Sequence, residues 1–133
     1  MNKIEHIGIA VKSLELSIPI FEKLLGSKCY KIEIIKDQHV KTAFFTIGDS
    51  KIELLESINN QGPIENFITK NGEGIHHIAF QVNDVDDALK QTKELGFRLI
   101  DNTSRIGADG LRIGFLNPRS TNSVLIELCS NEK

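Results

Sequence analysis

The stretch IEHIGIAVKSLELSIPIFEKLLG, residues 4–26, returns in altered form as IHHIAFQVNDVDDALKQTKELG, residues 75–96. In each copy, alternating apolar residues typical of a strand are followed by a polar break, a helical pattern and a glycine. The alignment places His6 on His77 and Leu24 on Leu95. An internal repeat of this kind predicts two similar halves within one chain.

Three alternating apolar segments follow each predicted helix, so each half is expected to have the order βαβββ. The predicted strands after the helices are residues 29–35, 40–47 and 51–56 in the first half and residues 97–100, 112–116 and 123–129 in the second. In the second helix Asp84 is the predicted N-cap and Gly96 the C-terminal glycine. Pro19 falls inside the first helical pattern and is expected to start, bend or shift that helix.

The two halves are expected at about residues 4–56 and 74–129 of a single domain that covers residues 1–133. Residues 57–73 form a helical linker, with Ile64, Phe67 and Ile68 on one face and Gly72 at the end. One four-stranded sheet with one helix cannot enclose a core, whereas two copies side by side can. The predicted fold class is therefore α+β, with two tandem βαβββ modules in a curved, mixed eight-stranded sheet.

The composition is that of an ordinary globular protein, with 40% hydrophobic and 26% charged residues in 133. A net charge of −2 gives no electrostatic reason to expect binding to nucleic acid or to an anionic membrane. The N-terminal residues lack a signal-peptide pattern and no apolar run is long enough for a membrane span, so we expect a cytoplasmic protein. Cys29 and Cys129 fit no metal or redox spacing and are expected as reduced thiols, although a disulfide between them stays open.

Polar residues interrupt the apolar strands at equivalent positions of the repeat. His6 corresponds to His77, and the segments KIELLE and LIELCS place Glu53 opposite Glu127. A single histidine or glutamate in a strand is usually an ordinary polar residue. Two histidines and two glutamates at equivalent positions favour a metal site instead, because buried carboxylates need a partner and a divalent cation can satisfy all four groups.

This donor set suits Co, Ni, Mn, Fe or Zn with one or two coordination positions left for substrate oxygens, and it does not choose among these metals. Neighbouring side chains of a strand point to opposite faces, so His76 cannot share the face of His77. We expect His76 to have a packing role, and His39 to be a loop residue of the polar segment KDQHVK.

The segments IEHIGIAV, KIELLES, NGEGIHHIAF and FLNPRSTNSVLIEL resemble those of the vicinal-oxygen-chelate superfamily, which includes glyoxalases, extradiol dioxygenases and bleomycin-resistance proteins. The resemblance covers essentially the whole chain. Within the superfamily, the double histidine after NGEG and the ending NPRSTNSVLIEL look most like the methylmalonyl-CoA epimerases, with glyoxalase I (lactoylglutathione lyase) close behind. The resemblance implies paired βαβββ modules, metal ligation by His6, Glu53, His77 and Glu127, an acyl-CoA thioester substrate and a homodimer.

An epimerase of this kind removes and replaces the proton on a carbon flanked by a thioester and a carboxylate, with the metal stabilising the enolate. Glu127 is the expected base, and Glu53 is expected as a ligand with a possible second role. Some epimerases carry a further glutamate on the strand that matches Val40 to Phe45, but VKTAFF has no carboxylate, so the second base stays open. The alternatives are glyoxalase I, acting on the methylglyoxal–glutathione hemithioacetal, and a non-enzymatic module that binds metabolites or drugs.

Overall fold

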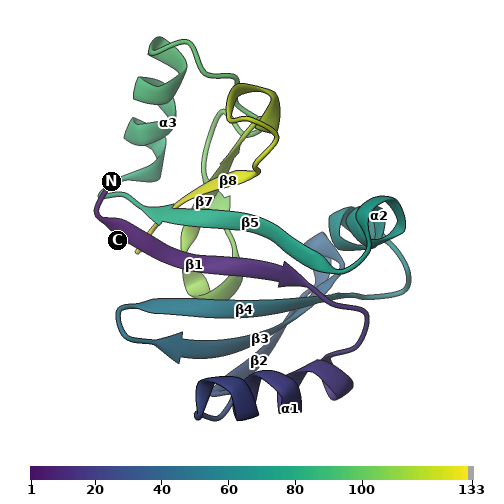
Figure 1. Cartoon of the computed structure of the whole chain (residues 1–133). Helices are drawn as coiled ribbons and strands as arrows, with labels where there is room; N and C mark the ends of the chain where they lie inside the picture. Colours follow the sequence, from purple (N-terminus) through teal and green to yellow (C-terminus); the bar gives the residue numbers. More distant parts are fainter. Residues whose placement is uncertain (132–133) are drawn as a thin grey trace. The chain divides into compact units, whose positions relative to one another are not determined.

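A computed structural model describes residues 1–131 of the chain (Figure 1). The three helices are α1 (Leu14–Leu25), α2 (Gly62–Asn71) and α3 (Val85–Glu94). The eight strands are β1 (Lys3–Ala10), β2 (Lys31–Ile35), β3 (Val40–Ile47), β4 (Ser50–Ser57), β5 (Gly74–Gln81), β6 (Arg105–Ile106), β7 (Arg112–Leu116) and β8 (Ile126–Ser130). The element order is therefore βαβββ, then α2, then βαβββ again.

The strands are hydrogen-bonded in the order β2-β3-β4-β1-β5-β8-β7-β6. The pairs β1–β4 and β5–β8 are parallel, whereas β2–β3, β3–β4 and β7–β8 are antiparallel. The sheet is thus mixed and eight-stranded, which confirms the α+β fold class with two βαβββ modules. Contacts divide the chain into two compact units, which we call the first unit (His6–His76) and the second unit (Met1–Glu5 with the described residues from His77 onward).

The core of the first unit lies on both faces of β3 and β4. Helix α1 packs on one face, where Leu14 contacts a cluster with Ala43, Phe45 and Leu54 (Figure 1). Helix α2 packs at one end of the opposite face, where Ile64 joins Ala10, Val40 and Leu55, with Phe67 and Ile68 against them. This confirms the predicted apolar face of the linker helix.

The helix termini follow the sequence signals. Ser13 and Asp84 are N-caps whose side chains accept hydrogen bonds from the backbone N–H groups of Leu16 and Asp87. Gly72 is the C-cap of α2. Gly96 directly follows Leu95, the C-cap of α3, and has a φ of +100°. Helix α1 runs through Pro19 rather than starting at it.

The predicted strand at residues 97–100 is wrong. Only Leu99 makes an isolated bridge, to Leu116, and the edge strand β6 lies later, at Arg105–Ile106. The physical reason is a side-chain contact: the Asp101 carboxylate accepts the backbone N–H of Phe115 at 2.8 Å and so replaces a ladder hydrogen bond. The other predicted strands are present, although β2 and β8 start two and three residues later than predicted.

Both cysteines are free thiols, and Cys129 is fully buried. Among residues 1–131, no helix has the length and apolar character needed to cross a membrane.

Candidate metal centre

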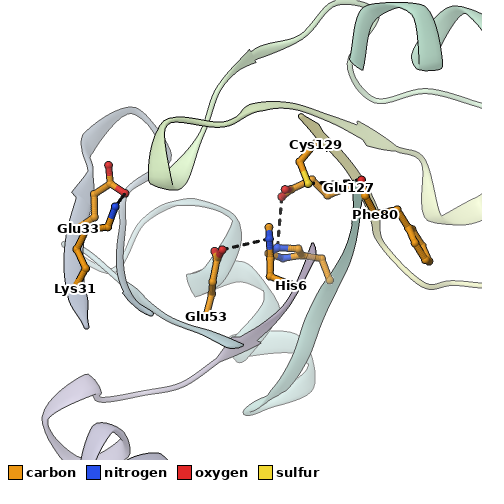
Figure 2. A network of polar contacts seen from close by, with 8 residues as sticks. His6, Lys31, Glu33, Glu53, Phe80, Glu127 and Cys129 are labelled. Carbon is orange, nitrogen blue, oxygen red and sulfur yellow. Dashed lines mark hydrogen bonds and ion pairs between the residues drawn. The ribbon is translucent and has the colours of Figure 1, made fainter. Parts of the chain in front are cut away.

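In the first unit, His6 and Glu53 come from the parallel neighbours β1 and β4. The strand register pairs Gly8 with Glu53, and His6 lies two residues before Gly8 on the same face. His6 Nδ1 is 3.2 Å from Glu53 Oε2, and both side chains are 3% exposed (Figure 2). Because Gly8 and Ala10 carry small side chains, the imidazole and the carboxylate can meet across the strands.

In the second unit, His77 and Glu127 repeat this arrangement on β5 and β8. The register pairs Ala79 with Glu127, and His77 lies two residues before Ala79. His77 Nε2 is 3.4 Å from Glu127 Oε1, with side-chain exposures of 6% and 5%. The ring of Phe115 contacts His77 edge-on, with centroids 5.7 Å apart. The internal repeat of the sequence therefore appears in the structure as one strand register used twice, with a histidine–glutamate contact through Nδ1 in the first unit and through Nε2 in the second.

The donor chemistry of each pair fits a divalent transition metal. Imidazole nitrogen and carboxylate oxygen are both ligands for Zn, Mn, Fe, Co and Ni. The four side chains are nearly fully buried, and a buried carboxylate requires a cationic or hydrogen-bonding partner. The structure thus brings the four predicted ligands together as two pairs, one in each unit.

His76 and His39 lie outside these pairs. His76 packs edge-on against Phe67 of α2, with ring centroids 5.1 Å apart, and burial lowers its pKa to about 4. His39 follows a short 3₁₀ turn in the left-handed conformation, with a φ of 53°. The packing role predicted for His76 and the loop position predicted for His39 are confirmed.

Two charged residues that the sequence reasoning missed lie on the same sheet face as His6 and Glu53. The strand register places Lys31 opposite Phe44 and Glu33 opposite Thr42. Phe44 is itself paired with Glu53. Lys31 Nζ is 3.9 Å from Glu33 Oε1 and 4.8 Å from the centroid of the Phe44 ring. Figure 2 draws both residues with Glu53 and His6. The alternation of β2 shows that Lys31 and Glu33 share one face of the strand. Only the pairing with β3 and β4 shows that this is the face that carries Glu53.

Residues 5–115 match the sequence signature of the glyoxalase/bleomycin resistance protein/dioxygenase superfamily. The chain belongs to this superfamily. Its relatives include the uncharacterized protein YqjC of Bacillus subtilis, 41% identical over 129 residues, which cover 97% of this chain and 92% of YqjC. The mitochondrial methylmalonyl-CoA epimerase of Dictyostelium discoideum is 37% identical over 129 residues, 96% of this chain and 78% of the relative.

Among solved structures of the superfamily, a methylmalonyl-CoA epimerase in complex with methylmalonyl-CoA and NH4+ matches with a TM-score of 0.94. It is 33% identical, and the match covers 98% of this chain and 95% of that one. The family assignment made from the sequence motifs is therefore confirmed, and several relatives at moderate identity are named epimerases.

Proposed function

We propose that this protein is a metal-dependent methylmalonyl-CoA epimerase. The observation that carries the proposal is the pair of buried histidine–glutamate contacts in one repeated register, in a chain whose relatives include methylmalonyl-CoA epimerases. The substrate would be an acyl-CoA thioester with a carboxylate on the α-carbon.

His6, Glu53, His77 and Glu127 would together hold one divalent ion per chain. The repeat supports this, because it supplies the same two donors from each half. A bound divalent cation supplies Lewis acidity that stabilises negative charge on the thioester and carboxylate oxygens of the substrate. The donor set does not select among Co, Ni, Mn, Fe and Zn.

Epimerisation requires removal of the α-proton from one face of the carbon and return of a proton on the other. We assign Glu127 as the base on one face. Its side chain is 5% exposed and lies beside His77. Because little water reaches this carboxylate, solvent would compete little with proton transfer between Glu127 and a bound substrate. Glu53 is assigned as a metal ligand that has a possible second role in proton transfer.

The same proton chemistry would serve glyoxalase I, which acts on a glutathione hemithioacetal, and a binding module of the same fold would need no chemistry at all. One assay separates the three functions. Purified protein is incubated with (2R)- and (2S)-methylmalonyl-CoA, and in parallel with the methylglyoxal–glutathione hemithioacetal, with and without added metal.

The proposal predicts interconversion of the two methylmalonyl-CoA epimers that depends on metal, and its loss in the variant His6→Ala. Turnover of the hemithioacetal alone would identify glyoxalase I instead. Binding of methylmalonyl-CoA without turnover of either substrate, in protein loaded with each of the five metals in turn, would identify a binding module.

A further inference from the structure

We propose that the outward face of helix α1 is the interface through which two copies of this chain form a dimer. Resemblance to the superfamily implied a homodimer but indicated no surface for it. The contact would join two α1 helices side by side in opposite directions, about a two-fold axis. This interface lies within the first unit and would form whether or not the protein is an epimerase.

An apolar row runs along the exposed side of α1. Leu16, Ile20 and Leu24 are spaced by four residues, so they follow one another along one face of the helix. Their exposed fractions are 71%, 62% and 72%, whereas the opposite face of α1 packs on β3 and β4 through Leu14 and its neighbours (Figure 1). Isolated exposed apolar residues are ordinary, but a contiguous row of large apolar side chains is typical of a contact surface.

The internal repeat provides a comparison for this row. The alignment of the two helices places Leu16 on Asp87 and Ile20 on Gln91 of α3. Both of these polar residues are exposed, as expected for a helix face in water. The two modules share the helix but not the apolar row. The βαβββ fold therefore does not itself require apolar residues at these positions of α1.

A second row, formed by Glu15, Pro19 and Lys23, runs beside the apolar row on one flank of the helix, and all three residues are exposed. It carries a negative charge near one end and a positive charge near the other. Two helices that pack in opposite directions about a two-fold axis meet along the same flank, so Glu15 of each copy would lie near Lys23 of the other. Packing in the same direction would bring like charges together.

The spacing along α1 fits the antiparallel arrangement. With a rise of about 1.5 Å per residue, Leu16 and Leu24 lie about 6 Å to either side of Ile20. Ile20 would therefore pack on Ile20 of the other copy, and Leu16 on Leu24. Glu15 and Lys23 would differ in height by about 3 Å, which the flexible lysine side chain can span. A surface that matches itself in both apolar pattern and charge suits a second copy of the chain.

A shallow hollow at the C-terminal end of α1 would receive Glu15 of the other copy. Its lining includes Lys23, Gly26 and Lys28. Glu22 also lines the hollow and offsets one of the two lysine charges, since its Oε1 lies 3.9 Å from Lys28 Nζ. The lining therefore keeps a net positive charge, which suits a carboxylate from a second copy.

Sedimentation velocity over a range of protein concentrations tests the interface. Ile20→Lys places two like charges at the centre of the antiparallel contact, and we expect the dissociation constant of the dimer to rise by at least about tenfold. Leu24→Lys should weaken the dimer independently. Leu95→Lys is the matched control, because Leu95 is 78% exposed and is the counterpart of Leu24 on α3. Its dissociation constant should equal that of the unaltered protein, and circular dichroism checks that every variant is folded.

Charge reversal tests the direction of the two helices. Glu15→Lys and Lys23→Glu should each weaken the dimer, because each brings like charges together across the interface. The double variant restores opposite charges between the copies and should regain most of the lost affinity. Each change also places a charge unfavourably for the helix dipole, and this effect is larger in the double variant. Regained affinity would therefore come from the contact between the copies.

An unaltered protein that stays monomeric at every concentration up to its solubility limit would overturn the interface. A dimer that neither Ile20→Lys nor Leu24→Lys weakens would also overturn it. A double charge variant that dimerises more weakly than either single variant would overturn the antiparallel arrangement. Sedimentation does not depend on turnover, so failure of the interface and failure of the proposed function are separate results.

Discussion

Glu127 Oε1 lies 3.4 Å from His77 Nε2, between two parallel strands whose register is the same as that of His6 and Glu53 in the other unit. One member of this contact carries an imidazole nitrogen that can bind a metal, and the other is a carboxylate, which can bind a metal or a proton. The two residues therefore have different expected roles in spite of their proximity, and substitution separates them.

His77→Ala removes one nitrogen donor from the proposed metal site. We expect metal affinity to fall, with partial recovery of activity when excess metal is added, because the remaining donors are unchanged. Glu127→Gln keeps an oxygen donor and removes the proposed base, so it should retain measurable metal and lose epimerisation by at least about a hundredfold. Metal titration by calorimetry, together with kinetics, checks both variants. Rescue of Glu127→Gln by excess metal would contradict its assignment as base.

Glu53→Gln gives the matched comparison on the other repeat. If Glu53 serves the metal alone, glutamine keeps an oxygen ligand and activity should fall less than about tenfold, far less than for Glu127→Gln. Activity of both variants at saturating metal is the measurement. Equal loss in the two variants would mean that Glu53 also transfers a proton.

Metal removal should abolish catalysis and leave the fold intact. Each unit has its own apolar clusters, centred on residues such as Phe45 and Leu54 in the first unit and Leu89 and Leu128 in the second. Burial of these side chains does not depend on an ion. Circular dichroism before and after chelation should therefore be nearly the same, with activity restored by added metal. Unfolding on chelation would show that the metal is structural.

The repeat of histidine and glutamate could be predicted from the sequence because it needs only alignment of two segments and strand alternation. His6 and His77 stood at matching positions, and the structure places each beside its glutamate. The face of the sheet on which Glu33 lies could not be predicted in this way. Alternation assigns Glu33 to one of two faces of β2, but the identity of that face depends on long-range pairing with β3 and β4.

The misplaced strand at residues 97–100 has a different cause. The segment has the apolar content of a strand, but a side chain outside it, the Asp101 carboxylate, binds the N–H of Phe115. Such competition between a side chain and a backbone ladder is decided by three-dimensional contact rather than by the apolar pattern.

Asp86 should stabilise the fold near neutral pH and lose this effect in acid. The backbone N–H of Ser104, and then its hydroxyl, donate to the Asp86 carboxylate and hold its pKa below the ordinary value of 3.8, with a smaller contribution from the charge of Arg112. A lowered folded-state pKa stabilises the fold above the unfolded value, and that stabilisation is lost as pH falls through the folded value. The thermal midpoint of Asp86→Asn should therefore be lower than that of the unaltered protein at pH 6, and the difference should shrink below about pH 4. A difference that is constant with pH would contradict this.

Gly114 of β7 is required by the close approach of α3. A Cβ at this position would lie 2.8 Å from Cδ1 of Leu89, so the fully buried Leu89 side chain would have to shift within the core. Gly114→Ala should lower the free energy of unfolding by about 1–3 kcal/mol through overpacking. Denaturant unfolding measures the loss, and the double variant Gly114→Ala/Leu89→Val should be less destabilised than the sum of its two single variants. Additive losses would rule out the contact as the cause.

The exchange of the α-proton of methylmalonyl-CoA with solvent tests the central claim most directly. The metal-loaded, unaltered protein is mixed with a single epimer in deuterated water, and proton NMR follows the signal of the α-proton. Proton removal by a carboxylate predicts loss of this signal at a rate at least as fast as the appearance of the other epimer, with both processes dependent on metal. An α-proton signal that decays no faster than it does without protein, with or without metal, would contradict the assignment of this chain as an epimerase.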